Sequence, residues 1–159
     1  MCVHYWLMKS EPDEYSITDL ERAKFQTTSW IGVRNYQARN FMREMKVGDR
    51  AFFYHSSCPE PGIAGIVEVA ALAHPDVTQF DAKSKYYDPK ATREEPRWLN
   101  VDVKLVKATR LISIAEMRAQ PALAEMVTLR RGNRLSITPV TKHEWDVVTK
   151  LAARKPAKA

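Results

Sequence analysis

The chain of 159 residues is long enough for one domain with one core, and its 45% apolar and 28% charged residues are typical of a globular protein rather than a disordered one. No apolar run approaches the roughly 20 residues that span a bilayer, which excludes a transmembrane helix. The formal net charge of +6 includes four basic residues at 150–159, and the remaining +2 favours polyanions only weakly. A nucleic-acid function must therefore depend on where the charges cluster.

Strands and helices alternate in the first half of the chain. Apolar residues at 3–8 predict a short strand, and Ser16 then suits the cap of a helix with Asp19 in its first turn. Asn35 begins a clearer helix, and Gly48 suits a left-handed stop after it. The apolar residues of this helix recur at i, i+3, i+4 and i+7 and predict one buried face: Ala38, Phe41, Met42 and Met45.

Three more strands and two more helices follow. Residues 50–56 and 63–72 predict strands, and Gly65 in the second indicates a bulge or a close backbone approach. Apolar and polar residues alternate over 99–105, which is the pattern of a half-buried strand. Two capping boxes, in which side chains satisfy the first free N–H groups, should each open a helix: Ser113-x-x-Glu116 and Thr141-x-x-Glu144.

The order of these elements favours an α+β fold. Strands separated by short helices without regular βαβ alternation argue against a doubly wound sheet. Neither a GxGxxG nor a GxxxxGK[ST] motif occurs, so nucleotide-phosphate binding of the usual kinds has no support. The polar segment 73–97 is long and irregular. Because such segments are uncommon in compact domains, we expect this one to have a functional role.

The histidines and cysteines favour neither a metal site nor a catalytic one. No two histidines lie three or four residues apart, and Cys2 and Cys58 form no CxxC pair, so we expect no metal, no cofactor and reduced thiols. Residues 55–58, His-Ser-Ser-Cys, place nucleophiles beside a base, but neighbours in sequence supply neither an oriented base nor oxyanion donors. We assign no catalytic residue. The first residues lack the pattern of a signal peptide, and we expect a cytoplasmic protein.

Three basic clusters favour a polyanion partner. One face of the helix after Arg34 carries cations, and free N–H groups at its start suit an anion. Arginines surround a Gly-Asn turn in the second cluster, and the third interleaves cations with rings, as phosphate binding and base stacking require. Each alone is typical of a solvated surface. Together they shift the balance towards a polyanion partner, and they comprise Asn35, Arg39, Arg43 and Lys46; Arg130, Arg131 and Arg134; and Lys83, Lys85, Tyr86 and Tyr87.

Trp30 allows two interpretations. It precedes Gly32 and the basic helix, where the sequence changes from strand to helix. A tryptophan is most often part of the core, but a ring beside free backbone donors is also how a planar base is held. The residue type and its position leave both interpretations open.

Ordered motifs over nearly the whole chain resemble the EVE domain of the PUA-like superfamily. The match runs from Tyr5 to about Leu151 and consists of YWLMKSEP at 5–12, WIGVRNYQARN at 30–40, VGD at 47–49, AFFYHS at 51–56, SKYYDP at 84–89 and RGNRLS at 131–136. The resemblance implies one domain over residues 1–151, built as a distorted β-barrel with short helices around it. We expect the basic tail at 152–159 to be disordered.

The resemblance also implies a function and a site. EVE domains are regarded as readers of modified bases, particularly modified cytosine in DNA, and they are related to YTH domains, which read methylated adenine in RNA. The Lys9-Ser10 pair and Trp30 match the YTH pattern, which implies a base-contacting edge and a cage wall. The predicted base pocket comprises Lys9, Ser10, Trp30, Asn35, Tyr36, Tyr54 and His55. The predicted phosphate contacts are Arg34, Arg39, Lys85, Arg130, Arg131 and Arg134.

The primary hypothesis is a non-enzymatic module that accepts a flipped or unpaired modified base in DNA or RNA, without a membrane partner. A second is an enzyme, such as a hydrolase, that acts on a modified nucleoside or base with Lys9, Glu11 or His55 transferring a proton. A third is a protein-interaction module with a basic surface. Turnover separates the second from the first, and salt-dependent binding to nucleic acid separates the first from the third.

Overall fold

The structure, a computed structural model, describes residues 3–154, so Cys2 and most of the predicted disordered tail lie outside it. Its strands are β1 (Tyr5–Ser10), β2 (Thr27–Ser29), β3 (Arg50–His55), β4 (Gly62–Pro75), β5 (Leu99–Ser113) and β6 (Ile137–Val140). Its α-helices are α1 (Ile17–Arg22), α2 (Tyr36–Glu44), α3 (Ile114–Arg118) and α4 (Lys142–Ala152). No helix in the described range is long and apolar enough to cross a membrane.

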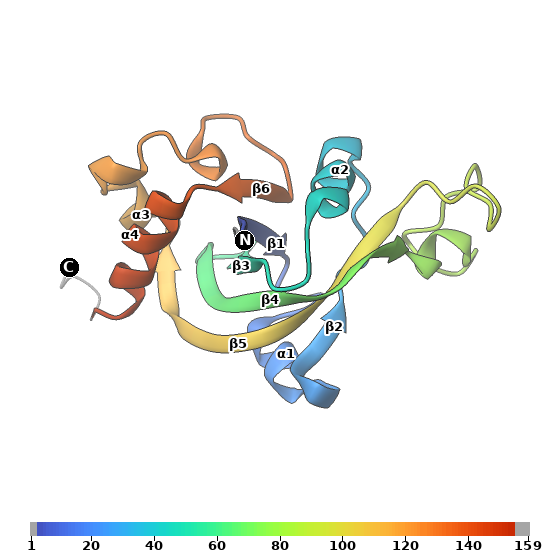
Figure 1. The fold of residues 1–159 in the computed structure, drawn as a ribbon, viewed down its shortest axis with the longest axis horizontal. Coiled ribbons are helices and arrows are strands. Elements are labelled where there is room, and N and C mark those ends of the chain that lie inside the picture. Colours follow the sequence, from blue (N-terminus) through green and yellow to red (C-terminus); the bar gives the residue numbers. More distant parts are fainter. Residues whose placement is uncertain (1–2, 155–159) are drawn as a thin grey trace.

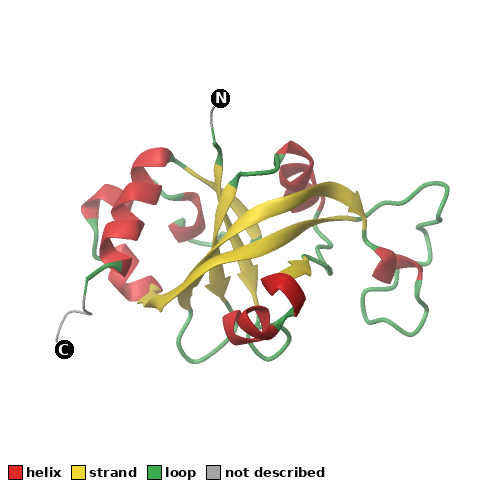
Figure 2. Ribbon diagram, turned by 60° about the horizontal axis from the view of Figure 1, so that its bottom comes forward, coloured by secondary structure: helices red, strands yellow, loops and turns green. Residues whose placement is uncertain are grey.

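The strands form one mixed sheet in the order β2-β5-β4-β3-β1-β6 (Figure 1). This arrangement confirms the α+β class. The sheet is strongly curved but open, because its end strands β2 and β6 do not pair with each other, so the predicted barrel is not closed. The long, bent pair β4 and β5 extends beyond the other strands and carries the irregular segment 76–98 at its far end (Figure 2).

The two core clusters lie on opposite faces of the sheet, as alternation along β1 and β3 requires. Phe53 belongs to the cluster covered by α1 and α2, whereas Phe52 and Tyr54 belong to the cluster covered by α3 and α4. The buried face predicted for α2 is confirmed, since Ala38 and Met42 are fully buried. This division determines which side chains of β3 can reach a site on either face.

All four predicted helix starts, at Ser16, Asn35, Ser113 and Thr141, are confirmed. Ser16 forms a complete capping box with Asp19, and Thr141 forms one with Glu144. Asn35 caps α2 by accepting a hydrogen bond from the backbone N–H of Ala38 at 3.0 Å.

Two local predictions need correction. Ser113 caps α3, but only half of its predicted box forms, because the Glu116 carboxylate pairs with Arg110 at 2.7 Å instead of reaching back to the cap. Gly48 does adopt a positive φ of 97°, but α2 has already ended at Glu44, so Gly48 shapes the turn before β3 rather than the helix stop. Both differences arise from contacts and turns that the short motifs do not encode.

Gly65 marks a close approach, as predicted. The pairing of β4 with both neighbours shifts register beside it. A Cβ atom at this position would lie 2.6 Å from Cδ1 of Ile17 and 3.0 Å from the Lys107 carbonyl oxygen, so the Ile17 side chain would have to move. The glycine therefore allows α1 to pack directly on β4.

Candidate nucleic-acid site

The segments that follow β1, follow β3 and precede β6 meet at one edge of the sheet, where these strands end or begin. β1 and β3 are parallel, with Ser10 opposite His55, so their carboxyl ends lie together. β6 runs antiparallel to β1 and therefore begins at the same edge. Backbone hydrogen bonds join these segments, from Lys9 N–H to the Ser136 carbonyl at 2.8 Å and from Ser56 N–H to the Ser10 carbonyl at 2.9 Å.

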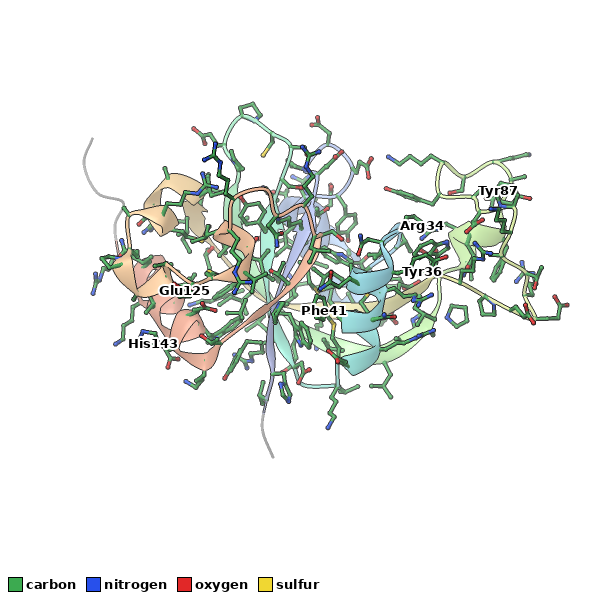
Figure 3. All side chains as sticks on the ribbon, turned by 90° about the horizontal axis from the view of Figure 1, so that it is seen from above. Arg34, Tyr36, Phe41, Tyr87, Glu125 and His143 are labelled. Carbon is green, nitrogen blue, oxygen red and sulfur yellow. The ribbon has the colours of Figure 1, made fainter. Side chains whose placement is uncertain are left out.

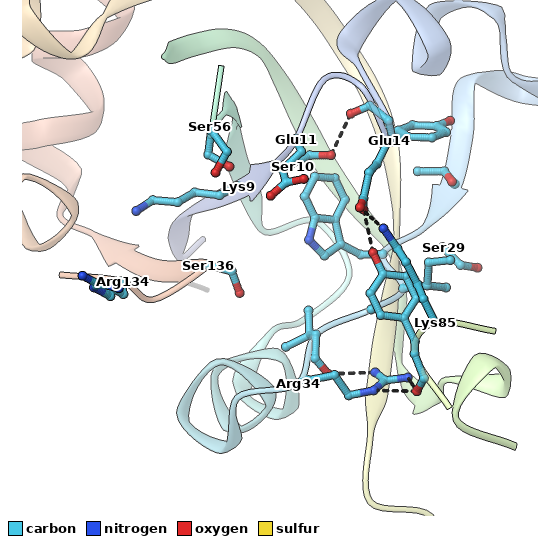
Figure 4. A pocket seen from close by; sticks show the side chains of 18 residues that line it. Lys9, Ser10, Glu11, Glu14, Ser29, Arg34, Ser56, Lys85, Arg134 and Ser136 are labelled. Carbon is cyan, nitrogen blue, oxygen red and sulfur yellow. Dashed lines mark hydrogen bonds and ion pairs between the residues drawn. The ribbon is translucent and has the colours of Figure 1, made fainter. Parts of the chain in front are cut away.

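An open cavity of about 1000 Å³ lies between this edge and the segments 28–34 and 85–86 (Figure 4). Its lining combines polar side chains with Trp30. Arg34 and Lys85, from the segments 28–34 and 85–86, also line it. Six of the predicted site residues line it: Lys9, Ser10, Trp30, Arg34, Lys85 and Arg134. The fold thus brings together residues that are up to 125 positions apart.

Both interpretations of Trp30 hold in part. The side chain is only 6% exposed and packs edge-to-face on Phe53, with ring centroids 5.3 Å apart and planes at 84°. Its backbone N–H donates to the Val101 carbonyl at 2.8 Å, which anchors the chain just after β2. Trp30 is therefore a core residue that also forms part of the cavity wall.

Lys9 carries a half-buried ammonium group into the cavity. Its Nζ lies 5.6 Å from the centroid of the Tyr54 ring. Among residues 3–154, no hydrogen bond or ion pair to this Nζ is formed, and burial lowers the pKa of Lys9. The neighbouring Ser10 hydroxyl donates to the Tyr15 carbonyl at 2.7 Å, so its oxygen lone pairs are what it can offer a ligand.

Arg34 holds one wall of the cavity together. A guanidinium group has five N–H donors. Those of Arg34 bind the carbonyls of Val33 and Tyr86, the Thr78 hydroxyl and the carboxylate of Asp76, with Nη1 3.1 Å from Asp76 Oδ2. Every donor is occupied within the protein, so the predicted phosphate contact has no free N–H of Arg34 to use. The sequence signal was correct for a guanidinium beside an anion, but the anion is Asp76.

Asp76 is a fully buried carboxylate. Burial by itself would raise the pKa of Asp76, but hydrogen bonds from Thr78, Gly32 and Arg34 outweigh it and hold that pKa below its usual range. The Gly32 N–H donates to Oδ2 at 2.8 Å. Asp76 therefore ties the segment after β4 to the segment that contains Trp30.

A second set of contacts secures the opposite rim. The Glu14 carboxylate accepts a hydrogen bond from the Tyr86 hydroxyl at 2.6 Å and pairs with the Lys85 ammonium. The Tyr86 ring lies directly over Gly32, where a Cβ would come within 2.6 Å of Tyr86 Cζ. The long segment that the sequence singled out thus forms a wall of the cavity. Glu14, Gly32, Asp76 and Tyr86 are site residues that the predicted site lacked, although Gly32 and Tyr86 lie within its EVE motifs.

Four predicted base-pocket residues do not line the cavity. Tyr54 is 4% exposed and points to the opposite face of β3 from Phe53. Asn35 uses its side-chain oxygen as the α2 cap. Tyr36 is half-exposed and stacks on Trp98 with centroids 4.8 Å apart, on the side of α2 toward the 76–98 segment (Figure 3).

His55 is the fourth of these residues. Its Nε2 accepts a hydrogen bond from the Ile17 backbone N–H at 3.1 Å, which requires a neutral ring, and the ring lines a separate open groove of about 520 Å³ with Cys58. Asn35, Tyr36, Tyr54 and His55 thus lie outside the lining of this cavity, and a role for them in base binding stays a prediction.

The remaining predicted phosphate contacts divide into two groups. Arg134 lines the cavity, and Arg130 and Arg131 are exposed on the same turn. Arg39 lies outside the lining, where it donates to the Arg97 carbonyl at 2.9 Å and covers the Tyr36 ring. The turn at 130–134 is thus the basic cluster that lies nearest the cavity with its side chains open to solvent.

The pH dependence of stability should reveal the lowered pKa of His55. Burial lowers the pKa of His55, so the folded state binds its proton less well than the unfolded state does. Its contribution to stability is complete above the unfolded pKa near ~6.5 and is lost as the pH falls toward the folded value. Thermal melting between pH 8 and pH 4 should show this loss in the native protein and a smaller loss in His55→Gln, which cannot titrate. Parallel curves for the two proteins would contradict the assignment.

Comparison with known proteins identifies the family. Residues 4–151 match the EVE domain. Human thymocyte nuclear protein 1 is 44% identical over 171 aligned residues, which cover 96% of this chain and 76% of the human protein. The chain belongs to the EVE domain family. An uncharacterized protein of Schizosaccharomyces pombe is 37% identical and matches 93% of this EVE domain chain and 68% of the yeast protein.

Solved structures agree with this assignment. A Pseudomonas putida protein is 50% identical, with a TM-score of 0.89 over 93% of this chain and 99% of that one. Human thymocyte nuclear protein 1 (THYN1) was solved in complex with DNA that contains 5-methylcytosine. It matches this EVE domain with a TM-score of 0.91 and 44% identity, covering 96% of this chain and 99% of the human one.

Proposed function

We propose that this EVE domain binds nucleic acid and reads a modified base, with 5-methylcytosine in DNA as the first candidate. The observation that carries the proposal is the TM-score of 0.91 and 44% identity to human THYN1, which was solved with 5-methylcytosine DNA. The cavity of about 1000 Å³ offers space for a nucleoside. Ligand sites commonly occupy ~300–1,000 Å³.

The residues of the cavity suggest how a base is held. A base that is stacked in a duplex exposes neither its face nor its pairing edge, so the target must be flipped out or unpaired. The Trp30 ring would pack on the base, while Lys9 and Ser10 contact its polar edge. Arg134 and its neighbours on the 130–134 turn would hold phosphates.

The proposal assigns no catalysis to this site. The proton-transfer candidates are separated, since Lys9 and Glu11 line the cavity whereas His55 lines the other groove. Within the described range, no cluster of three His, Cys, Asp or Glu side chains is arranged to hold a metal ion. Incubation with modified oligonucleotides and nucleosides, followed by mass spectrometry, should return them unchanged. Any new product would favour the enzyme hypothesis.

Discrimination between bases provides the main test. Titration at one salt concentration with matched DNA and RNA oligonucleotides should rank hydroxymethylcytosine at least equal to methylcytosine, and both above cytosine. One buried methyl supplies about 0.8 kcal/mol, and a fitted pocket gains ~1–3 kcal/mol. A hydroxyl can add a hydrogen bond with Ser10. Equal affinity for all three bases would reduce the cavity to a general stacking site.

Salt dependence should locate the phosphate contacts. For a single strand, log affinity falls with log salt with a slope of about −0.7 per phosphate. Arg131→Ala combined with Arg134→Ala should therefore flatten the slope by about 1.4, if each holds one phosphate. The control, Arg118→Ala with Lys150→Ala, removes two exposed cations from α3 and α4 and should keep the native slope. An unchanged slope in the first variant places the contacts elsewhere.

The cellular location is part of the same proposal. The sequence predicts a cytoplasmic location, which stays a prediction. The human and chicken relatives are named as nuclear proteins, so a nuclear location is the alternative. Imaging of the tagged protein in its own cells tests it.

A further inference from the structure

The four cations that line the cavity differ in what they can offer a ligand. Arg34 has every N–H donor occupied within the protein, and Lys85 is paired with Glu14. Arg134 is exposed at the rim, where water solvates its guanidinium. Lys9 is half-buried, and its Nζ has no acceptor among residues 3–154. Of the four, it is the one that is partly buried and has no partner in the part of the chain that the structure describes.

The acids around the cavity do not neutralise Lys9. Glu14 is engaged by Lys85 and by the Tyr86 hydroxyl. Glu11 is exposed and forms no ion pair with Lys9 in the part of the chain that the structure describes. Figure 4 shows Lys9 on the side of Arg134 and Ser136, across the cavity from Glu14 and Lys85. This side of the cavity therefore has positive charge without a protein counter-charge.

Partial burial of a charge without a partner costs free energy, and a ligand of opposite charge offsets that cost. The lowered pKa of Lys9 agrees with this picture, because it reflects desolvation that nothing compensates. The nearest described aromatic ring, that of Tyr54, provides only a weak contact at 5.6 Å. What the site lacks is an oxygen anion.

We propose that Lys9 is the counter-ion for an anionic oxygen that the bound nucleotide brings into the cavity. The proposal rests on the proposed function and makes Lys9 a specificity-determining residue. Two parts of a nucleotide can supply this oxygen. One is a carboxylate at C5 of an oxidised cytosine, and the other is the phosphate next to the flipped nucleotide. In the first case the domain prefers carboxylcytosine to methylcytosine.

The experiment compares affinities at fixed salt for four matched DNA oligonucleotides. They contain cytosine, 5-methylcytosine, 5-carboxylcytosine, or 5-methylcytosine with uncharged methylphosphonates on both sides. The proteins are native, Lys9→Met, Lys9→Arg and the control Lys150→Met, which removes an equal charge from an exposed position on α4. Melting curves verify that each variant is folded.

If the carboxylate is the partner, native protein binds carboxylcytosine about tenfold or more tightly than methylcytosine. Lys9→Met loses this preference, while Lys9→Arg and Lys150→Met keep it. If the phosphate is the partner, the methylphosphonates weaken native protein by about tenfold and leave Lys9→Met unaffected. Either result supports the proposal.

The proposal is overturned if native protein shows neither the carboxylcytosine preference nor a methylphosphonate effect, or if Lys9→Met changes neither. Native protein that shows neither effect overturns the proposal whether or not Lys9→Met folds. Native binding of methylcytosine over cytosine tests the proposed function separately. A domain that reads methylcytosine but ignores both anions would retain that function and lose this inference.

Discussion

Trp30→Ala should lower the free energy of unfolding by roughly 3–5 kcal/mol, because it removes a large ring from the core. The ring is 6% exposed and packs on Phe53, so its loss leaves a cavity that the rigid sheet cannot close. For a domain of this size, the midpoint should fall by about 2–4 °C per kcal/mol. Thermal melting measures the effect, and an unchanged midpoint would contradict the core position.

Trp30→Phe separates the two roles of this residue. Phenylalanine keeps an aromatic ring against Phe53, so the loss of stability should be much smaller than in Trp30→Ala. A base stacked on the wall typically gains ~1–3 kcal/mol, and the smaller ring should forfeit part of it. Titration of a folded Trp30→Phe protein with methylcytosine DNA measures that part. Native affinity in this variant would remove Trp30 from the binding surface and leave it as core alone.

Arg34→Met should cost about 3 kcal/mol of stability, since it leaves the fully buried Asp76 carboxylate without its counter-charge. The Arg34 side chain is 21% exposed, so solvent screens the pair only in part. The substitution also releases the carbonyl of Tyr86 and should loosen segment 76–98. Urea unfolding measures the stability, and limited proteolysis detects the loosened segment.

Two further variants verify the cause. Arg43→Met removes an exposed cation from α2, the helix that follows Arg34, and should change stability by no more than about 0.5 kcal/mol. Adding Asp76→Asn to Arg34→Met removes the stranded charge and should recover part of the loss. Equal losses for Arg34→Met and Arg43→Met would show that the buried pair does not stabilise the wall.

Local features of this fold could be predicted because their partners are close in sequence. Ser16 and Thr141 each form a capping box with an acid three residues later, so the motif contains the whole interaction. The box at Ser113 forms only in part, because the Glu116 carboxylate binds Arg110, which lies six residues earlier in β5 and outside the motif. The buried face of α2 likewise depended on spacing within one helix.

Site residues were harder to predict, because their roles depend on burial and distant partners. The aromatic run of β3 offered several rings for the pocket, but Tyr54 is 4% exposed within the cluster covered by α3 and α4 and does not reach the cavity. Arg34 has the charge of a phosphate contact, yet its anion lies 42 residues away. Neither fact can be read from residue type, and the family resemblance carried the positions of Lys9, Ser10 and Trp30 without their contacts.

The sequence by itself determined the class of fold, the helix starts and the family, because periodicity, caps and long ordered motifs are properties of neighbouring residues. The tertiary structure decided which cations are free. Parallel pairing of β1 with β3 places Lys9 at the cavity, whereas Arg34 is paired with Asp76 and Lys85 with Glu14. Charge is a property of the side chain, but its availability depends on what the folded chain places within reach.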